Sequence, residues 1–270
     1  MFSITDLIIT CLIYHTAYGV DTQIVGGTNA SAEQYPYQVS LKQNGNHFCG
    51  GAIIHKKFVI TAAHCLSEKL PKDISIDVGS IYLDNPKTRY LAHNLIIHPD
   101  YNETLHINDI GLINLTNKIS FSNNTKLINL TSSDRNFEGL QLNVTGWGKL
   151  KTDGLIPNQL QQIVVNGFSQ TECVELYSNS TNNMCTLTAV NKGMCDGDAG
   201  SALTYEDELV GIMSYNRQPC ADGNPDVFTK VYPYKEWINK TINKTINAGS
   251  NQQLNIILGS FMTYLCISFM

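Results

Sequence analysis

The sequence predicts an all-β fold, and three observations support this prediction. Short runs of β-branched and aromatic residues recur between turn residues, as in residues 37–41, 74–78 and 209–213. A helical amphipathic pattern comes only at residues 234–240, near the end of the chain. The length of 270 residues fits one large all-β unit and does not require two unrelated domains.

The first 19 residues are typical of a secretory signal. Residues 7–13 form its apolar core, and Ala17 and Gly19 supply the small residues of a cleavage site. A basic segment before the core is missing. An uncleaved membrane anchor is the alternative, but the apolar core is short for crossing a bilayer.

Composition excludes some classes of function. Hydrophobic residues make up 43% of the chain, which is ordinary for a globular core. The formal net charge is −5 and no basic run occurs, which argues against nucleic-acid binding. We therefore expect partners other than nucleic acids, and the sequence does not reveal an oligomeric state.

The C-terminal segment 245–270 carries no charged residue, and residues 254–270 are mostly apolar up to the terminus. Small or polar residues at 247–251, followed by an apolar tail, predict a glycosylphosphatidylinositol signal, although the spacer is shorter than usual. The lack of a basic stop argues against an ordinary membrane span. A tail anchor and a soluble protein with an unprocessed tail remain as alternatives.

Cysteines and glycosylation sequons both indicate an oxidising compartment. Of eight cysteines, Cys11 lies in the signal and Cys266 in the tail, and the other six could pair in 15 ways. No Cys-x-x-Cys pair occurs, so neither zinc nor another metal or cofactor is expected. Nine Asn-x-Ser/Thr sequons fit a secreted glycoprotein. They begin at Asn29, Asn102, Asn114, Asn123, Asn129, Asn143, Asn179, Asn239 and Asn243.

Several motifs follow one another in a characteristic order. They are Ile-Val-Gly-Gly at 24–27, Phe-Cys-Gly-Gly-Ala-Ile-Ile at 48–54, Thr-Ala-Ala-His-Cys at 61–65, Asn-Asp-Ile-Gly-Leu at 108–112, Thr-Gly-Trp-Gly at 145–148, Met-Cys-Asp-Gly-Asp-Ala-Gly-Ser at 194–201, Gly-Ile-Met-Ser-Tyr at 211–215 and Pro-Asp-Val-Phe-Thr-Lys-Val at 225–231. Together they resemble the chymotrypsin-like serine proteases, from Ile24 to about Lys240.

This resemblance implies a domain organisation. Residues 1–19 would be the signal, 20–23 a short propeptide and 24–244 the protease domain, ahead of the tail. The implied fold is two six-stranded antiparallel β-barrels (the trypsin-like fold) with a C-terminal helix and the cleft between the barrels. The implied disulfides are Cys49–Cys65, Cys173–Cys185 and Cys195–Cys220.

The catalytic positions are where the chain departs from the family. His64 matches the general base, and Asp109 matches the buried carboxylate that fixes the histidine tautomer. Ala199 stands where the family has the attacking serine. A methyl group has no lone pair to attack a carbonyl and no proton to give a histidine, so the resemblance implies a protease scaffold without its nucleophile.

Two further features of the active site are implied by the resemblance. The backbone N–H groups of Gly197 and Ala199 would form the oxyanion hole, which needs no side chain. Asp198 would pair with the α-ammonium group of Ile24 after cleavage of a zymogen. However, Gln23 precedes Ile24, where a trypsin-like activator needs Lys or Arg, so ordinary tryptic activation looks unavailable.

The resemblance also implies a substrate-binding surface. Ser214, Tyr215 and Asn216 match the strand that pairs with an extended peptide. Gly193 would form the floor of the specificity pocket and Asp226 its wall, while Asn216 would narrow the entrance. An alternative is that the pocket is filled by its own side chains.

Three hypotheses about function follow. The leading hypothesis is a secreted, catalytically silent homologue that binds peptides, protease inhibitors or protein partners in its cleft. The second is an active serine endopeptidase in which Ala199 reflects an engineered or erroneous substitution. The third is a structural or adhesive surface protein, attached to the membrane through the tail, that uses the barrels only as a scaffold.

Overall fold

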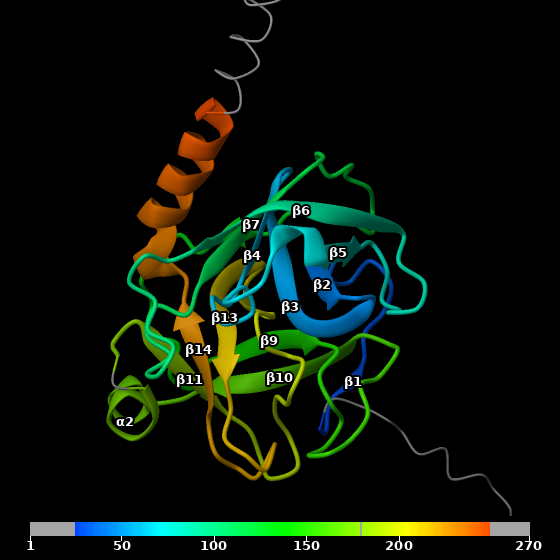
Figure 1. Ribbon diagram of the computed structural model, residues 1–270. Coiled ribbons are helices and arrows are strands. Elements are labelled where there is room, and N and C mark those ends of the chain that lie inside the picture. The colour runs from blue at the N-terminus through cyan, green and yellow to red at the C-terminus, as the bar shows by residue number, and fades with distance from the viewer. Residues whose placement is uncertain (1–24, 179, 249–270) are drawn as a thin grey trace, which may run out of the picture.

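Two closed six-stranded antiparallel β-barrels form the body of the chain, and a C-terminal helix follows them (Figure 1). The computed structural model describes residues 25–178 and 180–248. The predicted fold class is therefore confirmed. The signal, the propeptide and almost all of the uncharged tail lie outside the described residues.

The first barrel closes in the order β2-β3-β4-β7-β6-β5. Its strands are β2 (Gln38–Gln43), β3 (Asn46–His55), β4 (Phe58–Thr61), β5 (Ile74–Val78), β6 (Thr88–Ile97) and β7 (Gly111–Leu115). The hairpin between β2 and β3 turns at Asn44 and Gly45, which both have positive φ, as a two-residue type I′ turn requires. Every residue of β4 and β7 is buried, because both strands are apolar runs enclosed by the barrel.

The second barrel closes because β9 pairs with both β10 and β12. Its strands are β9 (Gln141–Gly146), β10 (Gln161–Gly167), β11 (Asn183–Leu187), β12 (Ala202–Tyr205), β13 (Glu208–Tyr215) and β14 (Asp226–Lys230). Two short strands extend its sheet: β1 (Thr28–Asn29) pairs with β10, and β8 (Asn129–Leu130) lies parallel to β13. Leu142, Val144 and Phe228 are among the residues of its separate apolar core.

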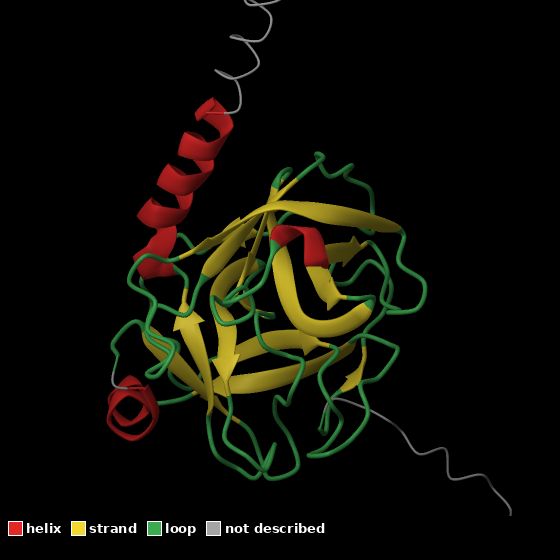
Figure 2. Cartoon of the chain, viewed as in Figure 1, coloured by secondary structure: helices red, strands yellow, loops and turns green. Residues whose placement is uncertain are grey.

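Helical segments are few and peripheral (Figure 2). They are the 3₁₀-helix η1 (Pro71–Asp73), α2 (Gln170–Cys173) continuing into the π-helix η2 (Val174–Ser178), and η3 (Tyr232–Tyr234), which leads into a helix over residues 235–248. The last helix is longer than the predicted 234–240, and it projects away from the barrels. Ile238 on this helix packs into the core of the first barrel, although the helix follows the last strand of the second. Among the described residues, no helix has the length and apolar character to cross a membrane.

Polar contacts join the two barrels beside the predicted active site. Buried Gln38 of β2 accepts a hydrogen bond from Thr145 of β9 at 3.0 Å. Its amide nitrogen donates to Ser201, just before β12, at 3.3 Å. The backbone N–H of Gly50 in β3 donates to the carbonyl of Ala199 at 2.7 Å. These bonds set the loop that carries Ala199 against the first barrel.

Candidate active-site cleft

Strand pairing brings His64 and Asp109 together from distant parts of the sequence. Strands β4 and β7 are antiparallel, and Thr61 pairs with Gly111. The residues that follow β4 therefore lie beside the residues that precede β7. His64 comes three residues after Thr61, and Asp109 comes two residues before Gly111, so both side chains reach the same end of the first barrel.

The carboxylate of Asp109 is fully enclosed and accepts three hydrogen bonds. His64 Nδ1 lies 2.8 Å from Oδ2, and the His64 backbone N–H donates to Oδ1 at 2.9 Å. The hydroxyl of Ser214 donates to Oδ2 at 2.5 Å. Burial alone raises the pKa of Asp109, but the hydrogen bonds and charge interaction with His64, together with Ser214, bring this pKa below its ordinary value. Asp109 is therefore a carboxylate that holds His64 in one tautomer, with the proton on Nδ1 and a lone pair on Nε2.

The half-buried side chain of Ala199 places a methyl group in the loop before β12. The backbone of this loop is tightly held, because the Gly200 N–H donates to the Met213 carbonyl at 2.8 Å, in addition to the bond between Gly50 and Ala199. The loop thus keeps a defined conformation without a hydroxyl at position 199.

Ser201 does not replace the missing hydroxyl. Its side chain is completely buried and accepts the hydrogen bond from Gln38. Its Oγ lies so close to Gly50 that a Cβ on that glycine would come within 2.1 Å of it. Ser201 therefore faces the junction of the two barrels, and none of its hydrogen bonds involves His64.

The two backbone donors of the predicted oxyanion hole make no hydrogen bond to any residue that the structure describes. Gly197 has a φ of 99°, in the region that favours glycine, and its carbonyl lies 3.0 Å from Nε2 of His47. Burial lowers the pKa of His47 to about 4, so its ring is neutral at pH 7. Nε2 then donates to Gly197, and Nδ1 accepts from the Ser40 hydroxyl at 2.8 Å. The sequence analysis did not identify His47, which orients the Gly197 peptide.

Asp198 points into the second barrel and is completely buried. Its carboxylate accepts the N–H groups of Gly148 at 2.7 Å and Cys195 at 3.0 Å. A Cβ at Gly146 or Gly148 would come within 2.0 or 2.2 Å of this carboxylate, so glycine is required at both positions. Burial raises the pKa of Asp198 to about 7.

The predicted partner of Asp198, Ile24, lies outside the described residues. Its neighbour Val25 accepts a hydrogen bond from the Gly193 N–H at 3.1 Å, which attaches the start of the described chain to the segment before Asp198. Pairing between Ile24 and Asp198 remains a prediction.

In the predicted specificity pocket, the side chains of Asn216 and Asp226 both bond the backbone of Met194. Asn216 donates from Nδ2 to the Met194 carbonyl at 2.7 Å, and Asp226 accepts the Met194 N–H at 3.0 Å. Burial raises the pKa of Asp226 to about 7. Gly193, with a φ of 148°, leaves room for this carboxylate, because a Cβ there would lie 3.1 Å from it. These contacts favour the alternative in which the pocket is filled by its own side chains.

A row of rings lines the cleft beside His64. The ring of His106 meets His64 edge to face, with centroids 6.1 Å apart, and lies against Tyr215 at 4.9 Å. The Tyr215 hydroxyl donates to the carbonyl of Tyr177. The sequence analysis did not identify His106, although it lies only three residues before Asp109 in the same loop.

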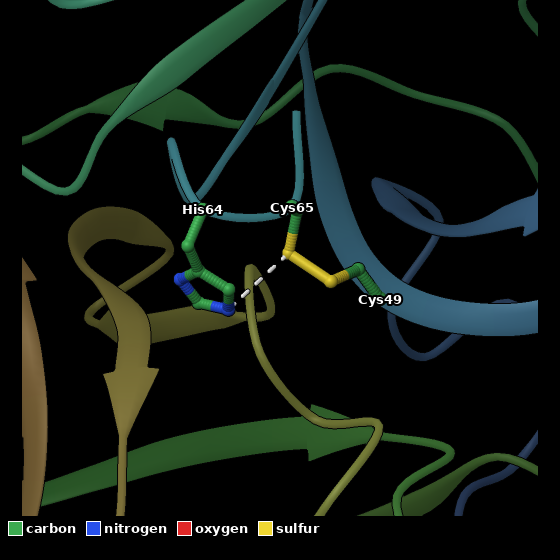
Figure 3. Close-up of side chains that lie close together, drawn as sticks. All are labelled: Cys49, His64 and Cys65. Atoms are coloured by element: carbon green, nitrogen blue, oxygen red, sulfur yellow. Dashed lines mark hydrogen bonds between the residues drawn. A yellow bond between two sulfur atoms is a disulfide. The ribbon is translucent and has the colours of Figure 1, made fainter. Parts of the chain in front are cut away.

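Three disulfides connect the pairs that the resemblance implied. They are Cys49–Cys65, Cys173–Cys185 and Cys195–Cys220. Figure 3 shows that the first disulfide connects Cys49 of β3 to Cys65, the residue after His64. Nε2 of His64 lies 3.7 Å from Sγ of Cys65. The third ties the segment before Asp198 to the loop after β13. The disulfides also indicate an extracellular protein, because such bonds persist in oxidising compartments.

Comparison with known proteins agrees with this geometry. The family model described as Trypsin matches residues 24–238. The chain belongs to the trypsin family of chymotrypsin-like serine proteases.

Relatives within the trypsin family cover most of the chain. Chymotrypsin-2 of Vespa crabro is 42% identical over 218 residues, which is 80% of this chain and 99% of that protein. Trypsin beta of Drosophila erecta is 34% identical over 225 residues, or 81% of this chain and 88% of that protein. Among solved structures, human heparin binding protein superposes with a TM-score of 0.74 at 29% identity, covering 82% of this chain and 97% of that chain.

Membership of the trypsin family assigns the chain to the serine endopeptidases, the hydrolases that cleave peptide bonds. His64 and Asp109 lie together as this chemistry requires, and Ala199 is predicted to stand where the family carries its serine. The structure thus shows a formed histidine–aspartate pair, and the lack of a nucleophile at position 199 remains a prediction from the sequence.

Proposed function

We propose that this chain is a secreted, proteolytically inactive member of the trypsin family that binds peptides, protease inhibitors or protein partners in its cleft. The observation that carries the proposal is the methyl group of Ala199 beside the intact hydrogen bond between His64 and Asp109. Without an attacking oxygen no acyl-enzyme forms, whatever the state of the histidine. In subtilisin, a different serine protease, loss of the serine lowers turnover by roughly a million-fold.

Binding remains feasible because the cleft is otherwise organised. The N–H groups of Gly197 and Ala199 make no hydrogen bond to a described residue, so they can donate to a carbonyl oxygen of a bound chain. Tyr215, at the end of β13, is half-buried and offers an aromatic surface, of the kind that contributes strongly to interfaces. Because Asn216 and Asp226 both hold Met194, recognition would rely on the groove and the loops rather than on a deep side-chain pocket.

Polyanion binding has no comparable support here. The structural neighbour is described as a heparin binding protein, and heparin is strongly anionic. This chain has 23 acidic and 18 basic residues, so its overall field repels a polyanion.

Activity-based labelling tests the loss of catalysis. The purified protein is expected to show no labelling by a fluorophosphonate probe and no burst with a chromogenic ester. The variant Ala199→Ser combined with Gln23→Arg, which supplies a nucleophile and a cleavable activation bond, is the positive control. Labelling of the unaltered protein at any side chain in the cleft would overturn the proposal.

Binding is tested separately with a protein inhibitor of serine proteases immobilised on a sensor surface. We expect saturable binding that is weakened by Tyr215→Ala in the cleft. The matched control is Tyr232→Ala, which changes an exposed tyrosine at the start of the C-terminal helix. Equal binding by both variants would show that the cleft is not the contact surface.

An active serine endopeptidase is the second candidate. It is favoured by the complete arrangement around Asp109, in which His64 and Ser214 both donate to the carboxylate. It requires that the natural protein carries serine where this sequence has Ala199. Sequencing the source gene decides between the two, because an alanine codon would eliminate this candidate.

A further inference from the structure

A cluster of metal-ligand side chains lies in the cleft. His64, His106 and Asp109 each offer a ligand atom, and the three atoms lie within 4.8 Å of one another. Nδ1 of His106 is buried and has no hydrogen-bond partner, which is unusual for a buried polar atom. The peptidase scaffold gives this nitrogen no role, so the cluster needs an explanation of its own.

The hydrogen bonds of the cluster show which atoms are available to a metal ion. Both oxygens of Asp109 are already engaged, because Oδ1 accepts the backbone N–H of His64 and Oδ2 accepts hydrogen bonds from His64 Nδ1 and the Ser214 hydroxyl. Nδ1 of His64 donates to Asp109, which leaves the lone pair on Nε2. Nε2 contacts the disulfide sulfur of Cys65 at 3.7 Å, and this sulfur is a weak acceptor (Figure 3). The imidazoles of His64 and His106 are therefore the available ligands.

A second group of potential ligands beside His64 is not available to a metal ion. Cys49, His64 and Cys65 also lie close together. The two sulfurs, however, are joined in a disulfide, as the yellow bond in Figure 3 shows, so neither is a thiolate.

The distance between the two imidazoles is close to that of a shared metal ion. With Zn–N bonds of about 2.0–2.1 Å in a tetrahedral site, two ring centroids lie roughly 5 Å apart. The centroids of His64 and His106 are 6.1 Å apart. The two rings are nearly perpendicular, at 89°, so both half-buried side chains would rotate to turn one nitrogen each towards a shared ion.

We propose that His64 and His106 form a zinc site at the mouth of the cleft, with Asp109 as the outer partner that orients His64. A carboxylate behind a ligating histidine fixes its tautomer and strengthens it as a ligand. Two imidazoles select zinc, copper or nickel over calcium and magnesium, which prefer oxygen ligands. The two remaining positions of a tetrahedral zinc ion would be filled by water or by a carboxylate or imidazole of a bound partner.

The site is independent of the proposed function, because Ala199 takes no part in it. Its relation to catalysis is nevertheless direct. In an active relative, Nε2 of the histidine takes the serine proton, and a metal ion on this atom would block the step. In this chain Nε2 has no such task, so a bound metal ion costs no activity.

Isothermal titration calorimetry of the full secreted chain, stripped with a chelator and titrated with zinc chloride, tests the site. We expect one zinc ion per chain, and no heat with calcium or magnesium. His106→Gln and His64→Gln should each weaken zinc binding by about tenfold or more. The matched control His93→Gln changes an exposed histidine on β6 and should bind zinc like the unaltered protein.

X-ray absorption on the loaded protein gives a second measurement that does not depend on variants. It should show two imidazole nitrogens at about 2.0 Å from zinc. His106→Phe keeps a ring against Tyr215, and thermal unfolding without metal checks that this variant is folded. The proposal is overturned if the unaltered chain gives no saturable heat, if His106→Phe binds zinc as tightly as the unaltered chain, or if the zinc spectrum lacks imidazole.

Discussion

Nδ1 of His64 lies 2.8 Å from Oδ2 of Asp109, although position 199 has no hydroxyl for this pair to activate. The pair is also part of the structure of the cleft. The carboxylate accepts the His64 backbone N–H, and the Asp109 carbonyl accepts the hydroxyl of Thr229 from β14 in the second barrel at 3.0 Å. Asp109 therefore joins the two barrels whether or not the cleft hydrolyses peptides.

Stability should depend on pH through Asp226. Burial raises the pKa of this carboxyl from 3.8 to about 7. Between these values the folded chain keeps a proton that the unfolded chain has lost, so the free energy of unfolding falls as pH rises from about 4 to about 7. The pKa of Asp198 is raised in the same way, to about 7. Asp226→Asn should therefore remove about half of the decrease in the free energy of unfolding.

Urea unfolding of the uncleaved chain across this pH range measures the effect. The matched control Asp84→Asn alters an exposed carboxyl and should leave the profile as it is. If the free energy of unfolding of Asp226→Asn changed with pH as steeply as that of the unaltered protein, the Asp226 carboxyl would be ionised throughout this range.

Gly50→Ala should destabilise the junction between the barrels. The new Cβ would come within 2.1 Å of Ser201 Oγ and 3.1 Å of Ser201 Cα. Overpacking of this kind costs about 1–3 kcal/mol in the free energy of unfolding. Ser201→Gly removes the clashing oxygen, so the double variant should be less destabilised than the sum of the two single changes. If urea unfolding showed that the effects of the two single changes are strictly additive in the double variant, residues 50 and 201 would not be in contact.

Asn216→Gly should open the specificity pocket. The change removes the hydrogen bond from Nδ2 to the Met194 carbonyl together with the side chain that is predicted to narrow the entrance. If the cleft binds protease inhibitors, affinity should rise by about tenfold, equivalent to roughly 1.4 kcal/mol. Surface plasmon resonance against inhibitors with small and large side chains at the cleavage position measures this gain. If none of these inhibitors bound the variant more tightly than the unaltered protein, Asn216 would not limit access to the pocket.

Asn114 should carry no glycan in the folded protein. It lies in β7, where all five residues are buried, and a glycan needs a solvent-exposed asparagine. Asn143 in β9 has the same sequon but is exposed, so it can accept one. Mass spectrometry after enzymatic deglycosylation distinguishes the two, since only a formerly glycosylated asparagine becomes aspartate. Conversion at Asn114 would contradict its burial.

Local sequence patterns determined much of the fold and of the catalytic positions. The strand predicted at residues 74–78 is β5, and that at residues 209–213 lies inside β13, because runs of β-branched residues between turn residues favour strands. His64 and Asp109 were identified because each lies in a short motif. The prediction that position 199 lacks a nucleophile rests on the sequence alone, because it depends on the identity of one side chain.

Only the tertiary structure decided how side chains from separate segments meet. His106 reaches His64 and Tyr215, His47 reaches the Gly197 carbonyl, and Asn216 reaches Met194. No motif signals these contacts, because each joins residues that only the packing of loops around two closed barrels brings together. The sequence by itself thus determined the family and the alanine at position 199, whereas the packing decided that the imidazoles of His64 and His106 are neighbours and that Asn216 and Asp226 both bond Met194. The physical reason is that chemical identity is a property of single residues, while distance is a property of the folded chain.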